Sequence, residues 1–147
     1  MSIKENKELV RQAFKEWNSV NGNVDKMRSL YEKYYAPSFI YHDVSGGDMN
    51  REQTIQESVK YLSAFPDVNY YIDDIIAEGD KTVIRCTMQA THKGMFMGIP
   101  ATGKQIVIKA VEIDKIAGGK ITEAWGFSDS QGLMMQLGVV PGIAPKT

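Results

Sequence analysis

The hydrophobic pattern of this 147-residue chain changes its period at Pro66. Before that proline, apolar residues recur every three or four positions, which is the period of an amphipathic helix. After it, they recur at every second position, which is the period of a strand with one buried face. Helices followed by consecutive hairpin strands predict an α+β domain, with the helices on one face of an antiparallel sheet.

Start and stop signals place the individual elements. Ser2 with Glu5, and Asn50 with Gln53, have the spacing of a capping box, which begins a helix. Helices are expected over residues 3–20, 24–36 and 51–65, with a short one over 133–137. Strands are expected over residues 39–42, 68–76, 84–92, 106–113 and 121–128, and a loop over 45–48.

Composition excludes two classes of partner. Seventeen Lys and Arg residues against 18 Asp and Glu leave a formal net charge of −1, without the basic excess that nucleic-acid binding needs. No apolar run approaches the roughly 20 residues of a membrane span, and the polar N-terminus lacks a signal-peptide stretch. The single Cys86 is interpreted as a buried thiol in a reducing compartment. We therefore expect a cytoplasmic protein with one domain over residues 1–147.

No motif indicates a cofactor or a metal. The segment from Gly98 to Lys104 fits the first seven positions of a phosphate-binding loop. However, Gln105 stands where the magnesium-binding hydroxyl belongs, and a strand follows instead of a helix. Two histidines and one cysteine provide few nitrogen and sulfur ligands. We expect neither a cofactor nor a metal.

Glu112 is the most informative polar residue, because it shares a strand face with Ile108 and Ala110. A carboxylate is rarely buried without a partner. If this face lines a pocket, burial would raise the pKa of the carboxyl toward the range that a general base needs. If it faces solvent or a second protein copy, Glu112 is a solvated charge.

Further candidates for acid–base chemistry are both histidines and one aspartate. His92 ends the apolar face of the strand that contains Cys86, so it is either a satisfied core residue or a group at a pocket mouth. His42 ends an apolar strand, and Asp43 after it fits an Asx-turn. Asp129 fits the N-cap of the final helix, and it is also a candidate site residue.

Several large side chains are candidates to line an apolar cavity, although residues at such spacings also build ordinary cores. The candidates for substrate binding are Trp17, Tyr41, Met97, Trp125 and Phe127. Their spacing does not decide between these two interpretations.

Short motifs are spread over nearly the whole chain. The most specific is the stretch from Thr91 to Lys104, which contains Gly-Ile-Pro-Ala-Thr-Gly. The others lie at residues 39–43, 65–67, 77–81, 119–121 and 129–138. Together they resemble the SnoaL-like polyketide cyclase (ester cyclase) family. The resemblance implies a cone-shaped α+β fold of the nuclear-transport-factor type, with a curved sheet wrapped around N-terminal helices, an apolar pocket, no cofactor and a homodimer.

The resemblance also implies roles for residues. In the family's cyclases an Asp takes a proton from an activated carbon and a His assists. Those positions are Gly126 and Glu112 here, so both depart from the pattern. His92 and Asp129 match a His and an acidic residue that those cyclases also carry. Glu112 is therefore a candidate for a relocated base.

Two functions are open. In the first, the chain is a cofactor-independent enzyme of the cyclase or isomerase type, which acts on a small apolar carbonyl compound by general acid–base proton transfer. Glu112 would be its base, with His92 or His42 as partner. In the second, the same fold is a non-catalytic module that binds an apolar ligand. A third option, a purely structural dimer, predicts a cavity filled by side chains. A homodimer is expected through the outer sheet face, with Val107, Val111 and Ile113.

Overall fold

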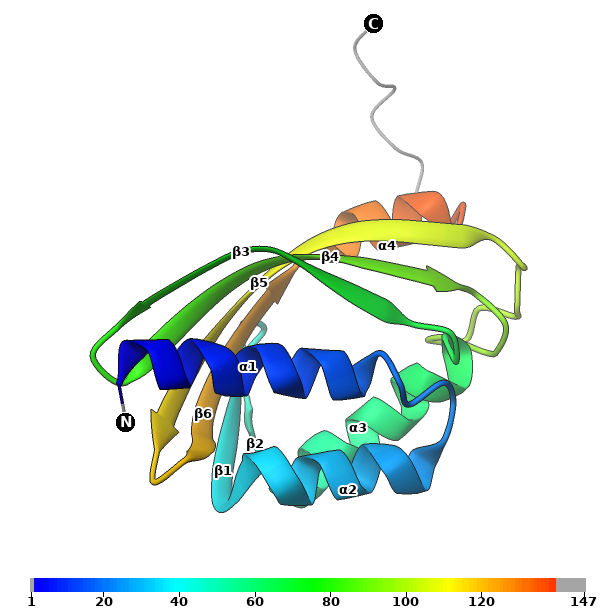
Figure 1. The fold of residues 1–147 in the computed structure, drawn as a ribbon. Helices are drawn as coiled ribbons and strands as arrows, with labels where there is room; N and C mark the ends of the chain where they lie inside the picture. The colour runs from blue at the N-terminus through cyan, green and yellow to red at the C-terminus, as the bar shows by residue number, and fades with distance from the viewer. Residues whose placement is uncertain (1, 140–147) are drawn as a thin grey trace, which may run out of the picture.

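The computed structural model describes residues 2–139 as four helices and one six-stranded sheet (Figure 1). The helices are α1 (Ile3–Trp17), α2 (Val24–Tyr34), α3 (Arg51–Ala64) and α4 (Ser130–Gln136). The strands are β1 (Tyr35–Asp43), β2 (Asp48–Asn50), β3 (Asn69–Glu78), β4 (Lys81–Thr91), β5 (Gln105–Ala117) and β6 (Lys120–Ser128). The predicted α+β class is confirmed.

Capping boxes begin α1 and α3, as the sequence predicts. The Ser2 hydroxyl accepts a hydrogen bond from the Glu5 backbone N–H at 3.1 Å, and the Glu5 carboxylate accepts one from the Ser2 N–H at 3.2 Å. Asn50 and Gln53 make the same reciprocal pair, at 2.9 Å each way. These bonds satisfy N–H groups that no helical carbonyl can reach, so the local sequence fixes both helix starts.

The sheet is mixed, which corrects the expectation of an antiparallel one. Its strand order is β2-β1-β6-β5-β4-β3, and β1 runs parallel to β6 while every other neighbouring pair is antiparallel. Side chains alternate in the same way along parallel and antiparallel strands, so the sequence pattern does not contain the pairing direction.

Several element boundaries also differ from the prediction. α1 ends at Trp17, before the expected stop, and the short β2 falls partly in the predicted loop. β1 begins at Tyr35, ahead of Pro37, and its register against β6 shifts between Tyr35 and Ile40. A proline lacks the backbone N–H of a regular ladder and is tolerated at such an irregularity.

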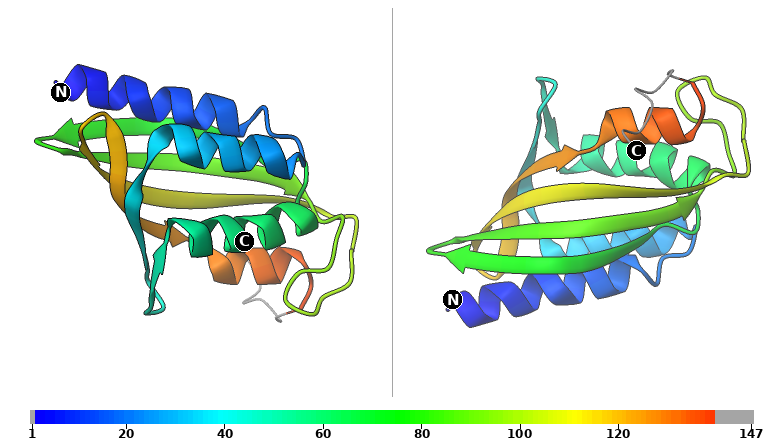
Figure 2. Two further views of the ribbon diagram at one scale, coloured as in Figure 1. Left: turned by 90° about the horizontal axis from the view of Figure 1, so that it is seen from below. Right: turned by 90° about the horizontal axis from the view of Figure 1, so that it is seen from above.

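The sheet curves over the first three helices. In Figure 1, β3, β4 and β5 arch above α1, while β1 and β6 run down toward α2. Figure 2 shows α1, α2 and α3 on the inner side of this curve. Apolar side chains from both layers pack against one another between them and form the core, among them Val10, Met27, Leu30, Phe39, Ile55, Phe65, Ile84, Ile106 and Ile121. Burial of each such side chain stabilises the fold by roughly 1.5–3 kcal/mol.

The last helix closes an open strand edge. Asp129 caps α4 by accepting a hydrogen bond from the Gly132 N–H at 2.8 Å. From the end of α4, the Gln136 amide accepts from the Val107 N–H at 2.8 Å and donates to the Val107 carbonyl at 2.9 Å. The Gln136 side chain thus continues the hydrogen bonding of the β5 edge beyond Ala110, where pairing with β6 ends. Across residues 2–139, every helix is too short or too polar to span a bilayer.

Candidate functional site

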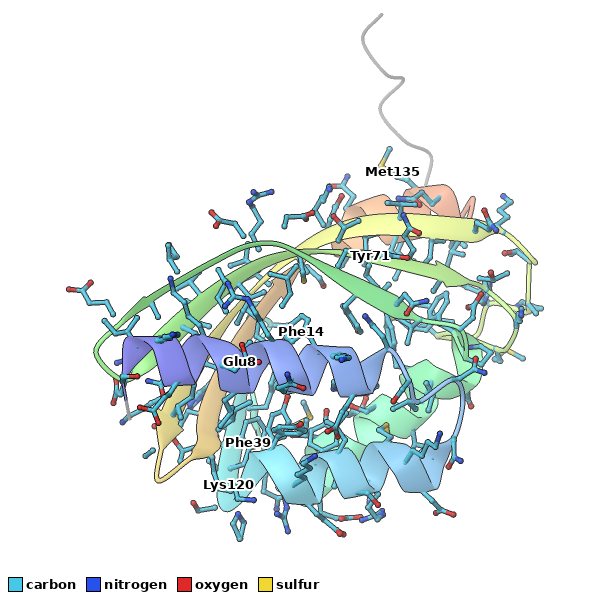
Figure 3. The ribbon with its side chains drawn as sticks, viewed as in Figure 1. Glu8, Phe14, Phe39, Tyr71, Lys120 and Met135 are labelled. Carbon is cyan, nitrogen blue, oxygen red and sulfur yellow. The ribbon has the colours of Figure 1, made fainter. Side chains whose placement is uncertain are left out.

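A cavity of about 550 Å³ lies between the inner sheet face and the first three helices. Its size falls in the range of small-molecule sites. Nine aromatic residues line it, contributed by α1, α2, α3 and strands β1, β3 and β6: Phe14, Trp17, Tyr31, Tyr35, Phe39, Tyr41, Tyr61, Tyr70 and Phe127. In Figure 3, Phe14 and Phe39 lie between the helices and the sheet, whereas Met135 lies outside.

Five of the seven tyrosines are in this lining. Burial raises the pKa of each of these phenols, and it brings Tyr41 to about 12. They are therefore neutral at physiological pH and able to donate hydrogen bonds. The Tyr31 hydroxyl lies 2.9 Å from the Ser58 hydroxyl, and the Tyr61 hydroxyl donates to the Met88 sulfur at 3.4 Å.

Two carboxyls project from the inner face of β5. Glu112 lines the cavity, and Asp114, two residues further along the same face, is 1% exposed. Burial raises the pKa of both carboxyls, and the negative charge of Glu112 raises that of Asp114 further. No donor among residues 2–139 reaches either Asp114 oxygen while both groups are ionised. The two carboxyls lie two residues apart on one strand face, and a hydrogen bond between them requires that they share a proton.

The charged groups of the lining all have one sign. Glu112 is joined there by Asp43 and Glu57, and no Lys, Arg or His is among the described lining residues. Nowhere in residues 2–139 do three His, Cys, Asp or Glu side chains converge as metal ligands would. The cavity therefore presents carboxyls and neutral phenols to whatever enters it.

Tyr41 stands beside the carboxyl pair. Gly126 on β6 is the register partner of Glu112 on β5. A Cβ atom on Gly126 would clash with the Tyr41 hydroxyl, so this hydroxyl occupies the place that a side chain at position 126 would take. The charge of Glu112 also contributes to the raised pKa of Tyr41, after burial. An acceptor and a donor are therefore neighbours on one wall of the cavity.

His92 is not part of the cavity lining. It is fully buried at the end of β4, where its ring packs against Phe65 at a centroid distance of 5.4 Å. Its Nδ1 lies 2.9 Å from the Thr102 hydroxyl and accepts the Thr102 backbone N–H at 3.2 Å. The core alternative for His92 fits this placement: the ring anchors the segment that precedes β5.

His42 and Trp125 lie on the outer face of the sheet. They are register partners on β1 and β6, and their rings stack at 4.9 Å. The ring nitrogens of His42 lie 2.8 Å from Asp48 and 2.9 Å from Glu123. These carboxylates, Glu123 first, raise the pKa of His42. Since Tyr41 points inward, strand alternation directs its neighbour His42 outward.

The remaining candidates divide in the same way. Trp17 and Phe127 line the cavity. Asp129 is outside the lining and caps α4. Met97 is 77% exposed in the loop before β5 and also lies outside it. The structure thus brings four candidates together around the cavity: Glu112, Trp17, Tyr41 and Phe127.

Asp114 is the main site residue that sequence analysis missed. Strand alternation carries it onto the face of Glu112, so the signal was present one step further along the same strand. The tyrosines of α2, α3 and β3 were missed for another reason. Helical spacing identified some of them as apolar positions, but only the curvature of the sheet determines which ones enclose a cavity.

Comparison with known proteins shows the same fold elsewhere. AclR, a proposed hydroxylase from Streptomyces galilaeus, is 26% identical with a TM-score of 0.87, and 98% of this chain and 87% of that chain are covered. A proposed polyketide cyclase from Acidithiobacillus ferrooxidans is 31% identical with a TM-score of 0.75, covering 93% and 97%. A protein of ketosteroid isomerase-like fold from Catenulispora acidiphila, crystallised with trimethylamine, shares the fold at 19% identity, with a TM-score of 0.70 and coverage of 90% and 94%.

No curated protein matches the chain. The family model described as SnoaL-like polyketide cyclase matches residues 8–137, from within α1 to the end of α4. That range contains all of the sheet and every residue of the cavity lining. With its nuclear-transport-factor-like fold, the chain belongs to the SnoaL-like polyketide cyclase family.

Proposed function

We propose that this protein is a cofactor-independent enzyme that moves a proton on a small apolar carbonyl compound, with Glu112 as the general base. The observation that carries the proposal is a carboxyl with a raised pKa on the wall of an aromatic cavity that has no basic residue in its described lining. A base whose pKa is closer to neutrality takes a carbon-bound proton more readily and still releases it.

Tyr41 supplies the matching donor. Glu112 takes a proton from the carbon next to the substrate carbonyl, and the electron pair of that C–H bond moves into the enolate. The enolate oxygen accepts a hydrogen bond from the neutral Tyr41 hydroxyl, which lies over the register partner of Glu112. Return of the proton from Glu112 to a different atom of the enolate completes an isomerisation. Alternatively, the enolate carbon attacks a second carbonyl, whose oxygen then takes the proton from Glu112, and a ring closes. Trp17 and Phe127 form the cavity walls that contact the apolar sides of the substrate.

The partial reaction offers a test that does not require the product to be known. Apolar ketones and β-dicarbonyl compounds are incubated with the protein in D2O, and loss of the α-hydrogen signal is followed by NMR. We expect the wild type to exchange at least one of them, and Glu112→Gln to exchange it at least ~100-fold more slowly, the scale of general-base catalysis. Glu57→Gln is the matched control, because Glu57 lines the cavity but makes an exposed ion pair with Lys60. Equal exchange by Glu112→Gln and the wild type would refute the assignment.

The second candidate is a binding module for an apolar ligand. It is favoured by Gly126, which stands where the resemblance places the Asp of the cyclases, and by the Tyr41 hydroxyl that fills the adjoining space. A ketone that binds tightly but keeps its α-hydrogens in D2O would support this alternative over the enzyme.

We further propose that the protein is a cytoplasmic homodimer. The outer sheet face supports the dimer, since Val107 and Val111, which alternate with the inward-facing Ile108 and Glu112, are 49% and 36% exposed there. Light scattering at the elution peak of a sizing column tests it, with Val107→Lys as the variant expected to give a monomer. A wild-type monomer at high concentration would contradict the dimer.

A further inference from the structure

Asp114 lies in a position where ionisation of its carboxyl is energetically unfavourable. It is 1% exposed, and Thr82, its register partner on β4, is fully buried with a hydroxyl that reaches no acceptor. An isolated charge in such a position costs several kcal/mol or more, so the group either finds a counter-charge or keeps its proton. The described residues offer no counter-charge.

The groups that face the pair come from four other elements. Tyr31 and Tyr35 approach from α2 and the start of β1, Tyr41 from further along β1, Tyr70 from β3 and Cys86 from β4. Burial raises the pKa of each, to about 12 for Tyr41 and Cys86, so all are neutral at physiological pH. None of them compensates a second negative charge.

Depth decides which carboxyl keeps the proton. Glu112 borders the cavity, whereas Asp114 lies behind it on the same strand face and is almost wholly enclosed. Two adjacent carboxyls in a low-dielectric interior hold one proton between them, and the more enclosed group gains more from being neutral. A neutral Asp114 can donate its O–H to the Glu112 carboxylate, which lies two residues away on the same strand face.

We propose that Asp114 is a positioning residue for the base: it keeps a proton inside the fold and donates it as a hydrogen bond to Glu112, which is thereby held ionised at the wall of the cavity. The inference rests on the proposed function of Glu112. Without this hydrogen bond, burial alone would leave Glu112 more readily protonated and poorer as a base at neutral pH.

Carbon-13 NMR of protein labelled at the carboxyl carbons of Asp and Glu tests the proposal without a substrate. Asp114→Asn and Glu112→Gln identify the two signals by their loss. We expect the Asp114 carboxyl to have the shift of a neutral acid at pH 7, and the Glu112 carboxyl that of an ionised one. An ionised Asp114 at pH 7 would overturn the proposal.

Two substitutions then separate the hydrogen bond from the packing. In Asp114→Val the donor is lost, and the titration midpoint of Glu112 is expected to rise by about one pH unit or more, a tenfold change in proton affinity. In Asp114→Asn the amide N–H replaces the donor, so the midpoint is expected to stay near the wild-type value. A midpoint that is the same in Asp114→Val as in the wild type would also overturn the proposal.

The outcome is independent of the exchange assay. If Asp114 is neutral and the Glu112→Gln variant still exchanges α-hydrogens, the proton-sharing pair is supported and the proposed role of Glu112 as general base is refuted. If Asp114 is ionised and the Glu112→Gln variant is inactive, the proton-sharing pair is refuted and the role of Glu112 as general base is supported.

Discussion

The Tyr41 hydroxyl and the missing side chain of Gly126 share one position in the cavity wall. Glu112 faces that position across the β5–β6 ladder. The resemblance places an acidic residue of the family's cyclases at position 126, and in this chain the Tyr41 phenol occupies that space. The two side chains cannot fill the same space, so the absence of a side chain at position 126 is what allows the Tyr41 hydroxyl to lie there.

Gly126→Ala tests this exclusion. The added methyl group forces Tyr41 to move, and overpacking of this kind destabilises a fold by roughly 1–3 kcal/mol. Urea unfolding measures the loss. In the background of Tyr41→Phe, which lacks the hydroxyl, the same Gly126→Ala change is expected to cost less. Additive effects of the two changes would contradict the shared position.

The raised pKa of His42 predicts how the free energy of unfolding changes with pH. Glu123 and Asp48 raise its pKa above the unfolded value of about 6.5, so its stabilisation is complete below that pH and is lost as pH rises through the folded pKa. We expect the free energy of unfolding to fall over that window. His42→Gln, measured by urea unfolding at stepped pH, is expected to remove this part of the fall. The same slope in both proteins would contradict it.

At the scale of elements, the sequence pattern contains more of the helices than of the sheet. Ser2 and Asn50 fix helix starts through bonds that span three residues, so local sequence is enough. β2 and the parallel β1–β6 pair depend on residues far apart in the chain. Alternation identified the buried face of β4 correctly, but it could not show that His92 lies beyond the cavity.

The contact between Gln136 of α4 and the edge of β5 predicts that its loss will expose the Val107 amide to hydrogen exchange. Gln136→Ala removes both hydrogen bonds to Val107, each worth about 0.5–1.5 kcal/mol. The amide hydrogen of Val107 is expected to exchange with solvent faster, as hydrogen–deuterium exchange can measure. Gln136→Glu is the matched control: its carboxylate can still accept from the Val107 N–H, so that amide should remain more protected than in Gln136→Ala. Equal exchange in all three proteins would contradict the role of Gln136.

At the scale of the whole molecule, curvature creates the site. The same strand faces in a flat sheet would meet the helices in a closed core, and Glu112 would have no open side. The hydrophobic pattern contains no measure of this curvature, although the family resemblance implies a curved sheet. That is why Glu112 could be selected from alternation, while the ring of tyrosines could not.

The buried carboxyls are expected to lower the stability of the whole fold. A carboxyl whose folded pKa is raised contributes stability below its unfolded pKa, about 4.3 for Glu, and that contribution is lost as pH rises through the folded value. Glu112→Leu should therefore unfold at a higher urea concentration than the wild type at pH 7, and its stability should fall less between pH 4 and pH 7. A less stable Glu112→Leu at pH 7 would contradict this, with Glu57→Leu as the exposed control.

The two tryptophans stand in separate electronic surroundings. Trp17 lies in the cavity lining, with Tyr31 and Tyr70 at edge-to-face distances of 6.0 and 6.3 Å, whereas Trp125 stacks on His42 outside the sheet. A protonated imidazole against an indole quenches its emission, and a ligand in the cavity changes the surroundings of the other indole. Intrinsic fluorescence therefore carries two independent signals: Trp125 reports the charge of the outer face, and Trp17 reports the occupancy of the interior.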